Sequence, residues 1–192
     1  WDFNEGDIID VIIYSNAHTV ELFLNGESLG KHEMALLTDE KMRAEYRVAY
    51  KAGTLSAKGY DESGKVVSED ILRTCGDPAK IVLSLYEDAP LTADGRDMAF
   101  VEISVVDRDG IPVDNARNRV KAEVIGAGRL VGLDNGDSTD TDPYQTQSRR
   151  LFSGKLLAMV ATTGETGDVL VQVSSPGKQT ASLTLQAVAA EM

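Results

Sequence analysis

Short segments in which apolar and polar residues alternate run the length of this chain, and turn-forming residues separate them. A period of two is typical of β-strands with one buried face, whereas an amphipathic helix needs a period near 3.6. Residues 19–24 show the pattern most clearly, because Val20, Leu22 and Leu24 share one face. Strands are therefore expected throughout, and segment 31–43 is expected to form one helical turn at most.

Asn25-Gly26 follows this segment directly. The pair is preferred in two-residue type I′ hairpin turns, whose central residues both need a positive φ. Residues 28–31 are then expected to form the returning strand of a hairpin.

The other expected strands share the alternating or β-branched pattern and are bounded by Gly, Asp or Pro. They cover residues 8–14, 43–50, 54–60, 65–72, 79–86, 98–107, 119–124, 129–133, 151–162, 168–174 and 180–187. In residues 43–50, the side chains expected on one face are Ala44, Tyr46, Val48 and Tyr50.

The string Gly76-Asp77-Pro78 interrupts the series and is typical of a junction between units. Short strands spaced 8–12 residues apart, with no helical pattern between them, favour β-sandwiches. The sequence therefore predicts an all-β chain of two tandem immunoglobulin-like sandwiches, residues 1–76 and residues 77–192.

Composition excludes several functions. Acidic residues outnumber basic ones 31 to 19, a net charge of −12, which argues against nucleic acid or an anionic membrane as a partner. No apolar run approaches the roughly 18–20 residues that a membrane helix needs. Cys75 is the single cysteine, so an internal disulfide is impossible. With two histidines besides, the chain has few of the ligands that a structural zinc site needs.

The chain begins with Trp1 and carries no basic or apolar leader pattern. We expect it to be a piece of a longer protein, so its localisation stays open.

Residues 26–30, GESLG, match the G-x-S-x-G nucleophile elbow of α/β-hydrolases. That elbow needs a strand, a strained turn and a helix, with an acid and a histidine later in the chain. Here the motif coincides with the expected hairpin, and the one histidine after Ser28 is His32. We expect a turn there, exposed positions for His32 and for His18 in a hairpin connection, and a buried, inert thiol at Cys75.

Residues 126–132, GAGRLVG, are rich in glycine but lack the spacing of a dinucleotide-binding loop and precede strand-like sequence. A tight turn between two strands is expected.

The loop of residues 134–142 is the most site-like segment. Its four carboxylates, Asp134, Asp137, Asp140 and Asp142, are possible calcium ligands. The spacing does not fit an EF-hand, because no glutamate closes the loop. Aspartate also favours turns by bonding its own backbone. We expect a turn-rich loop without a metal, and these four residues are the candidates if that expectation fails.

Aromatic residues gather in the first half of the chain: Trp1, Phe3, Tyr14, Tyr46, Tyr50 and Tyr60. Exposed aromatics can stack on sugar rings, whereas aromatics that alternate along strands are more often core residues. Both possibilities stay open. The many carboxylates also suggest a glycosidase pair, but no spacing shows two of them facing each other.

Longer strings give a specific resemblance. YSNA at residues 14–17 and VELFLNGESLG at residues 20–30 resemble the domain that follows the catalytic barrel in bacterial β-galactosidases of glycoside hydrolase family 2. AGTL at residues 52–55 and TCGDPA at residues 74–79 are similar to the family's G-T-L and T-A-G-x-P-A, with Cys75 in place of an alanine.

The second half continues the resemblance with ADGRD at residues 93–97, VVDRDG at residues 105–110 and GLDNGD at residues 132–137. These strings are similar to motifs of the last immunoglobulin-like domain in that family. The resemblance implies that the catalytic glutamates lie on a barrel outside this chain. We therefore expect no catalytic residue and no cofactor here, and an accessory region of a β-galactosidase-like enzyme whose partners are the barrel and possible carbohydrate. The alternative is an independent carbohydrate-binding or adhesion module.

Overall fold

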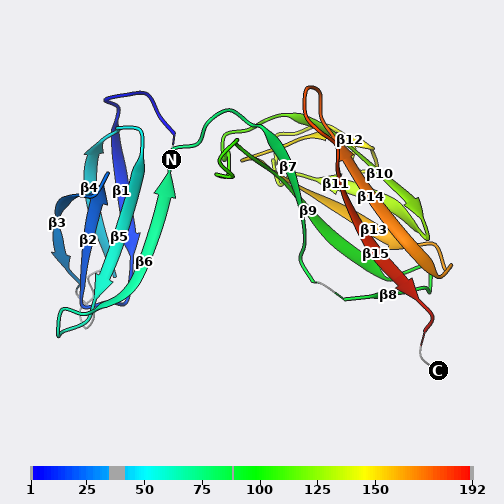
Figure 1. Cartoon of the computed structure of the whole chain (residues 1–192), viewed down its shortest axis with the longest axis horizontal. Coiled ribbons are helices and arrows are strands. Elements are labelled where there is room, and N and C mark those ends of the chain that lie inside the picture. Colours follow the sequence, from blue (N-terminus) through cyan, green and yellow to red (C-terminus); the bar gives the residue numbers. More distant parts are fainter. Residues whose placement is uncertain (1, 35–41, 88, 191–192) are drawn as a thin grey trace. The chain divides into compact units, whose positions relative to one another are not determined.

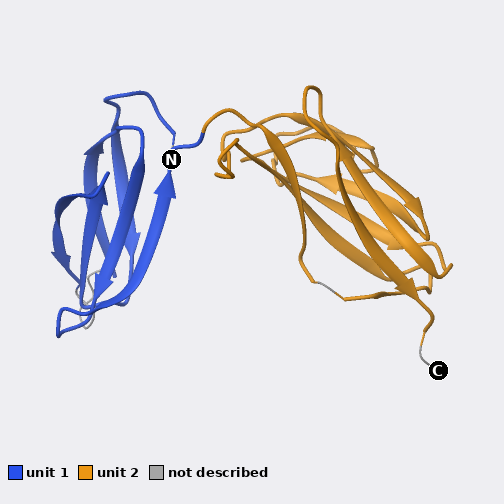
Figure 2. Cartoon of the chain, in the orientation of Figure 1, with its two compact units in different colours: residues 1–75 blue, residues 76–192 orange. Residues whose placement is uncertain are grey.

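The computed structural model describes residues 2–34, 42–87 and 89–190, and it divides into two compact units, residues 1–75 and residues 76–192 (Figure 2). All the regular secondary structure of the described residues is β-strand (Figure 1). The prediction of an all-β chain built from β-sandwiches is therefore confirmed. Within the described ranges, no helix has the length and apolar character needed to cross a bilayer.

The described residues of unit 1 form six strands: β1 (Ile8–Tyr14), β2 (Thr19–Leu24), β3 (Glu27–Glu33), β4 (Arg43–Ala49), β5 (Thr54–Tyr60) and β6 (Val66–Arg73). β1 and β4 form a two-stranded antiparallel sheet, and the other four form an antiparallel sheet in the order β3-β2-β5-β6 (Figure 1). The apolar face predicted for residues 19–24 is confirmed, since Val20, Leu22 and Leu24 are buried. Residue 33 ends β3, and the rest of the expected helical turn, residues 35–41, lies outside the described residues.

The hairpin turn between β2 and β3 has the predicted type I′ signature, because φ is +52° at Asn25 and +82° at Gly26. The Asn25 side chain also reaches the start of β5. Its Oδ1 accepts a hydrogen bond from the Thr54 amide (2.8 Å), and its Nδ2 donates to the Ala52 carbonyl (3.1 Å). Gly53, between those two residues, has φ +134°. The strings at residues 20–30 and 52–55 are thus in contact with each other through the Asn25 side chain.

In unit 2, nine strands lie in the part of the chain that the structure describes: β7 (Lys80–Leu85), β8 (Leu91–Thr92), β9 (Met98–Val106), β10 (Arg119–Gly126), β11 (Gly128–Asp134), β12 (Ser148–Arg150), β13 (Lys155–Thr162), β14 (Gly167–Ser174) and β15 (Ala181–Val188). One sheet has the order β11-β13-β9-β7 and the other β12-β10-β14-β15-β8. All pairs are antiparallel except β15 with β8. Alternate apolar residues on β9 and β14 are buried, which places the core between the sheets.

Two details of unit 2 differ from the expectation. Residues 151–162 are not one strand, because Ser153 (φ +48°) and Gly154 (φ +73°) form a tight turn between β12 and β13. The glycine-rich residues 126–128 form the expected tight turn, but it connects β10 and β11, which belong to different sheets.

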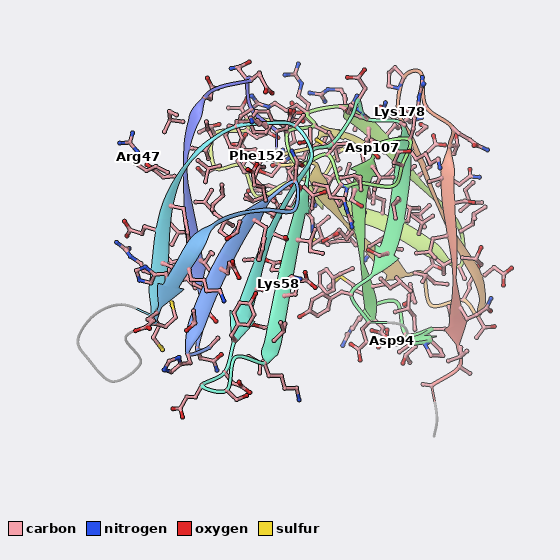
Figure 3. All side chains as sticks on the ribbon, turned by 60° about the vertical axis from the view of Figure 1, so that its left-hand side comes forward. Arg47, Lys58, Asp94, Asp107, Phe152 and Lys178 are labelled. Carbon is pink, nitrogen blue, oxygen red and sulfur yellow. The ribbon has the colours of Figure 1, made fainter. Side chains whose placement is uncertain are left out.

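The turn after β9 is closed by Asp107, whose side chain is labelled in Figure 3. This buried carboxylate accepts hydrogen bonds from the amides of Gly76 (2.8 Å), Asp109 (2.9 Å) and Ile111 (2.8 Å). The bond from Gly76 is the main reason why the pKa of Asp107 lies below its ordinary value, since a hydrogen bond to a carboxylate favours the charged form. Asp107 thereby attaches the first residue of unit 2 to its sheet.

Candidate functional site

The acidic loop that follows β11 is folded by its own aspartates. Three of them accept a hydrogen bond from the amide two residues ahead: Asp134 from Gly136 (3.0 Å), Asp137 from Thr139 (2.9 Å) and Asp140 from Asp142 (2.9 Å). Gly136 has φ +71°, which glycine adopts without steric cost. The loop therefore contains a series of turns in which aspartate oxygens accept from backbone amides, as aspartates in turns commonly do.

Three arginines face the same carboxylates. Arg149 Nε lies 2.9 Å from Asp140 Oδ2, Arg119 Nη2 lies 2.7 Å from Asp142 Oδ2, and Arg117 Nη2 lies 3.9 Å from Asp137 Oδ2. No pattern in the sequence predicts these pairs. Asp137, Asp140 and Asp142 are thus each compensated by a separate arginine rather than by a shared cation.

Arg149 is the central residue of this arrangement, because only 1% of its surface is exposed. It lies on β12, where alternation turns Arg150 outward and Arg149 inward. Its Nη1 donates to the Leu133 carbonyl (2.8 Å), and its guanidinium lies 4.7 Å from the centre of the Tyr144 ring. Arg149 therefore ties the loop both to β11 and to the segment before β12.

The pKa values of two loop carboxyls agree with this picture. Hydrogen bonds from the Thr139 hydroxyl and amide hold the pKa of Asp137 below its ordinary value. The Asp142 amide, then Arg149, lower the pKa of Asp140.

A polar cavity of about 350 Å³ adjoins the loop. Among the described residues, no group of three or more His, Cys, Asp or Glu side chains is arranged to hold a metal ion.

The G-x-S-x-G match lies at the start of β3, on the edge of the larger sheet of unit 1. The Ser28 hydroxyl donates to Glu21 Oε1 (2.7 Å), a carboxylate rather than a histidine. The segment continues as a strand and not as a helix, so the local geometry is that of a hairpin.

Glu21 is the centre of a polar cluster that the sequence analysis missed. Tyr60 donates its hydroxyl to Glu21 Oε2 (2.8 Å), and Lys31 Nζ lies 3.7 Å from the same oxygen. The bond from Ser28 is the largest cause of the lowered pKa of Glu21, and the bond to Glu21 is the largest cause of the raised pKa of Tyr60. These residues come from β2, β3 and β5, so only the strand pairing brings them together.

The histidines and the cysteine are placed apart from these clusters. His18 is exposed, but the hairpin expected around it is wrong, because it lies between β1 and β2, which belong to different sheets. Its Nδ1 lies 3.2 Å from Thr19 Oγ1. His32 is exposed on β3, as predicted, whereas Cys75 is half-buried rather than buried.

The aromatic residues of unit 1 divide between core and surface. Tyr50 is buried, and Phe3 packs edge-on against it with ring centres 5.9 Å apart. Tyr46 and Tyr60 are half-buried, and Tyr14 is 73% exposed. Trp1 lies outside the described residues. The described aromatic side chains do not form one continuous stacking platform, because Tyr14 lies on the exposed face of β1 and Tyr60 lies beside Glu21 on the other sheet.

Comparison with known families assigns both halves of the chain. Residues 83–184 match the family described as "Glycoside hydrolase family 2 C-terminal domain 5". Residues 6–68 match a family described as a domain of unknown function, DUF4982.

Similar proteins extend the match over nearly the whole chain. The β-galactosidase BoGH2A of Bacteroides ovatus is 35% identical over 188 residues, which is 97% of this chain and 22% of that protein. A putative β-glucuronidase of Formosa agariphila is 36% identical over 79% of this chain and 14% of its own length.

Among solved structures, a glycosyl hydrolase family 2 member from Bacteroides cellulosilyticus superposes with a TM-score of 0.91 and 32% identity. The superposition covers 98% of this chain and 24% of that one. This chain thus spans between a seventh and a quarter of the length of these similar proteins. The family match, the sequence identity and the fold agree, and the chain belongs to the C-terminal region of glycoside hydrolase family 2.

Proposed function

We propose that this chain is the non-catalytic accessory region of a longer family 2 glycosidase that hydrolyses β-galactosides or related β-glycosides. The observation that carries the proposal is the alignment of 97% of the chain with 22% of a β-galactosidase at 35% identity. In this proposal the catalytic carboxylates belong to a barrel outside these residues, and the two sandwiches support that barrel or shape the approach of the substrate.

The chemistry of the described carboxyl groups supports a non-catalytic role. Glycoside hydrolysis needs two carboxyls across a sugar, one of which stays protonated because its pKa is raised. The carboxyls whose pKa departs from its ordinary value all have it lowered: Glu21, Asp61, Asp94, Asp107, Asp137 and Asp140. Each is stabilised as an anion by hydrogen bonds, which suits a structural carboxylate and not a general acid.

Turnover by the purified chain tests the catalytic part of the proposal. The 192-residue chain is expected to hydrolyse no nitrophenyl β-galactoside, β-glucuronide or β-mannoside. Measurable turnover that a single substitution such as Glu21→Gln abolishes would contradict it. The Glu123→Gln variant, at an exposed position on β10, is the matched control for loss of one carboxylate.

Glycan binding separates the proposal from the alternative of an independent carbohydrate-binding module. Saturable binding of the isolated chain to a glycan array, lost on Tyr14→Ala, would favour the binding module. We expect no such binding, and we expect deletion of residues 1–192 from the longer enzyme to lower its stability or its kcat/KM.

A further inference from the structure

The sandwich of unit 1 is open along one side. Among the described residues of this unit, the smaller sheet has two strands and the larger sheet four, so part of the larger sheet has no described strand opposite it. In the described part of the chain, β1 pairs along one edge with β4, and β6 pairs along one edge with β5. The free edges of β1 and β6 border a cavity of about 420 Å³.

The inner face of β6 continues the core of unit 1 but is only partly covered. The register pairs Leu55 with Leu72 and Ala57 with Asp70, so Leu72 and Asp70 lie on the same face as the buried Leu55. Leu72 is nevertheless 48% exposed, whereas Leu55 is 3% exposed. Both line the cavity, together with Val11 and Ile13 of β1.

The two edges of the larger sheet differ in chemistry. β3 carries Lys31, His32 and two glutamates, the charged composition by which natural edge strands avoid pairing with other chains. β6 also carries charge, at Glu69, Asp70 and Arg73, but four of its eight residues are large, apolar and 41–55% exposed: Val66, Val67, Ile71 and Leu72. An apolar edge of this length is a liability in water unless another segment covers it. β6 thus exposes four large apolar side chains, whereas Leu29 is the one exposed large apolar residue of β3.

The charges beside the cavity indicate which charge a covering segment would need. Lys58, labelled in Figure 3, lies 3.6 Å from Glu69 and compensates it. Asp70 accepts a hydrogen bond from the Ile71 amide (2.9 Å) and makes no ion pair with any residue in the described ranges. A carboxylate that becomes covered needs a cation beside it. A segment over this side therefore requires a lysine or arginine facing Asp70.

We propose that the open side of unit 1 receives an extended segment of the longer glycosidase, which adds a strand to the free edge of β6, places apolar side chains over Leu72 and sets a basic residue against Asp70. The similar proteins are about four to seven times as long as this chain, so the same polypeptide supplies ample sequence for it. Main-chain bonds to β6 and alternate side chains in the cavity are the usual features of strand addition. The inference rests on the proposed function, because the occupant is the rest of that enzyme.

Amide hydrogen exchange in the 192-residue chain and in the longer enzyme tests this directly. Residues 66–73 are expected to exchange roughly tenfold or more slowly in the longer enzyme, because added strand pairing protects edge amides. Residues 27–33 of β3 provide the internal control and are expected to exchange equally in both. Equal exchange of residues 66–73 in the two proteins would overturn the proposal, and so would protection that depends on the concentration of the 192-residue chain, which indicates a second copy as the occupant.

Substitutions locate the contact. Leu72→Glu is expected to leave the melting temperature of the 192-residue chain nearly unchanged and to remove the protection of residues 66–73 in the longer enzyme. Asp70→Lys is expected to weaken the same protection by repulsion. The matched control is Leu29→Glu, since Leu29 is 40% exposed on β3 and should change neither protein. If Leu72→Glu leaves the protection intact, the strand-addition proposal fails, while the absence of turnover by the chain still stands as a separate result.

Discussion

Replacement of Gly53 by alanine should damage unit 1 far more than an ordinary glycine-to-alanine change. A Cβ at position 53 would lie 1.9 Å from Asn25 Oδ1 and 2.7 Å from Asn25 Cγ. Real atoms do not approach so closely, so the Asn25 side chain has to leave. It then loses its bonds to the Thr54 amide and the Ala52 carbonyl.

The expected loss in the free energy of unfolding has two sources. A non-glycine residue at φ +134° costs about 1–3 kcal/mol in backbone strain. Two exposed hydrogen bonds contribute about 0.5–1 kcal/mol each. A total of about 3 kcal/mol corresponds to a fall of roughly 12–24 °C in the melting temperature of a domain of this size.

Differential scanning calorimetry of the 192-residue chain measures this fall for the unit 1 transition. Gly64→Ala is the matched control, because Gly64 has φ +82° and no atom within 4 Å of the added Cβ, so only about 1 kcal/mol of strain is expected. Asn25→Gly removes the obstructing side chain, and in that background Gly53→Ala should cost markedly less. The reasoning is refuted if Gly53→Ala costs no more than Gly64→Ala, or if Asn25→Gly leaves its cost unchanged.

Four further outcomes follow from the contacts described. Gly26→Val should lower the stability of unit 1 by about 1–3 kcal/mol in urea unfolding, because φ is +82° there, and an unchanged midpoint would contradict the turn. Arg149→Met should speed hydrogen exchange in residues 134–142 and leave unit 1 unaffected; unchanged exchange would show that Arg149 does not hold the loop. Asp107 has a lowered folded pKa, so its stabilisation is complete above its ordinary pKa of 3.8 and is lost as the pH falls through the folded value. Asp107→Asn should therefore flatten the decline of stability in acid, measured by urea unfolding between about pH 2.5 and 5, whereas parallel curves for the two proteins would refute this. Calcium at about 10 mM should not raise the melting temperature relative to chelator, and a rise that Asp137→Ala removes would establish a metal site.

The sequence contained enough local information for the strands and their buried faces. Val20, Leu22 and Leu24 are buried because a strand with one covered face needs this alternation, and Asn25-Gly26 turns because both residues tolerate positive φ. The assignment of β1 and β2 to different sheets depends on pairing with β4 and β5, and alternation within a strand says nothing about its neighbours.

Short elements escaped prediction for a related reason. β8 has two residues and β12 has three, too few to show a period. The turn at Ser153 and Gly154 carried a recognisable signal, since Ser-Gly commonly forms turns, but the apolar residues on both sides suggested a continuous strand.

The arrangement of the acidic loop was only partly predictable. Local turns at aspartate follow from the residue type, and the structure contains them. The partnership of Arg149 with Asp140 depends on which of two adjacent arginines faces inward, and on a fold that brings β11 and β12 together. Adjacent arginines before an apolar residue were the one available signal, since strand alternation must bury one of them.

The position of β15 in its sheet has a consequence for synthesis on the ribosome. Every strand pair of unit 1 is formed within the first 73 residues. In unit 2, β8 pairs with β15, which ends only at Val188. At about 5–20 residues per second, the remaining sequence takes roughly 6–23 seconds to emerge. During that interval the nascent polypeptide has a first unit whose own strand pairs can all form and a second unit with unpaired strand edges. Chaperones that engage emerging chains would encounter β8 without its partner for most of that interval and β14 only near its end, before β15 fills the space between them.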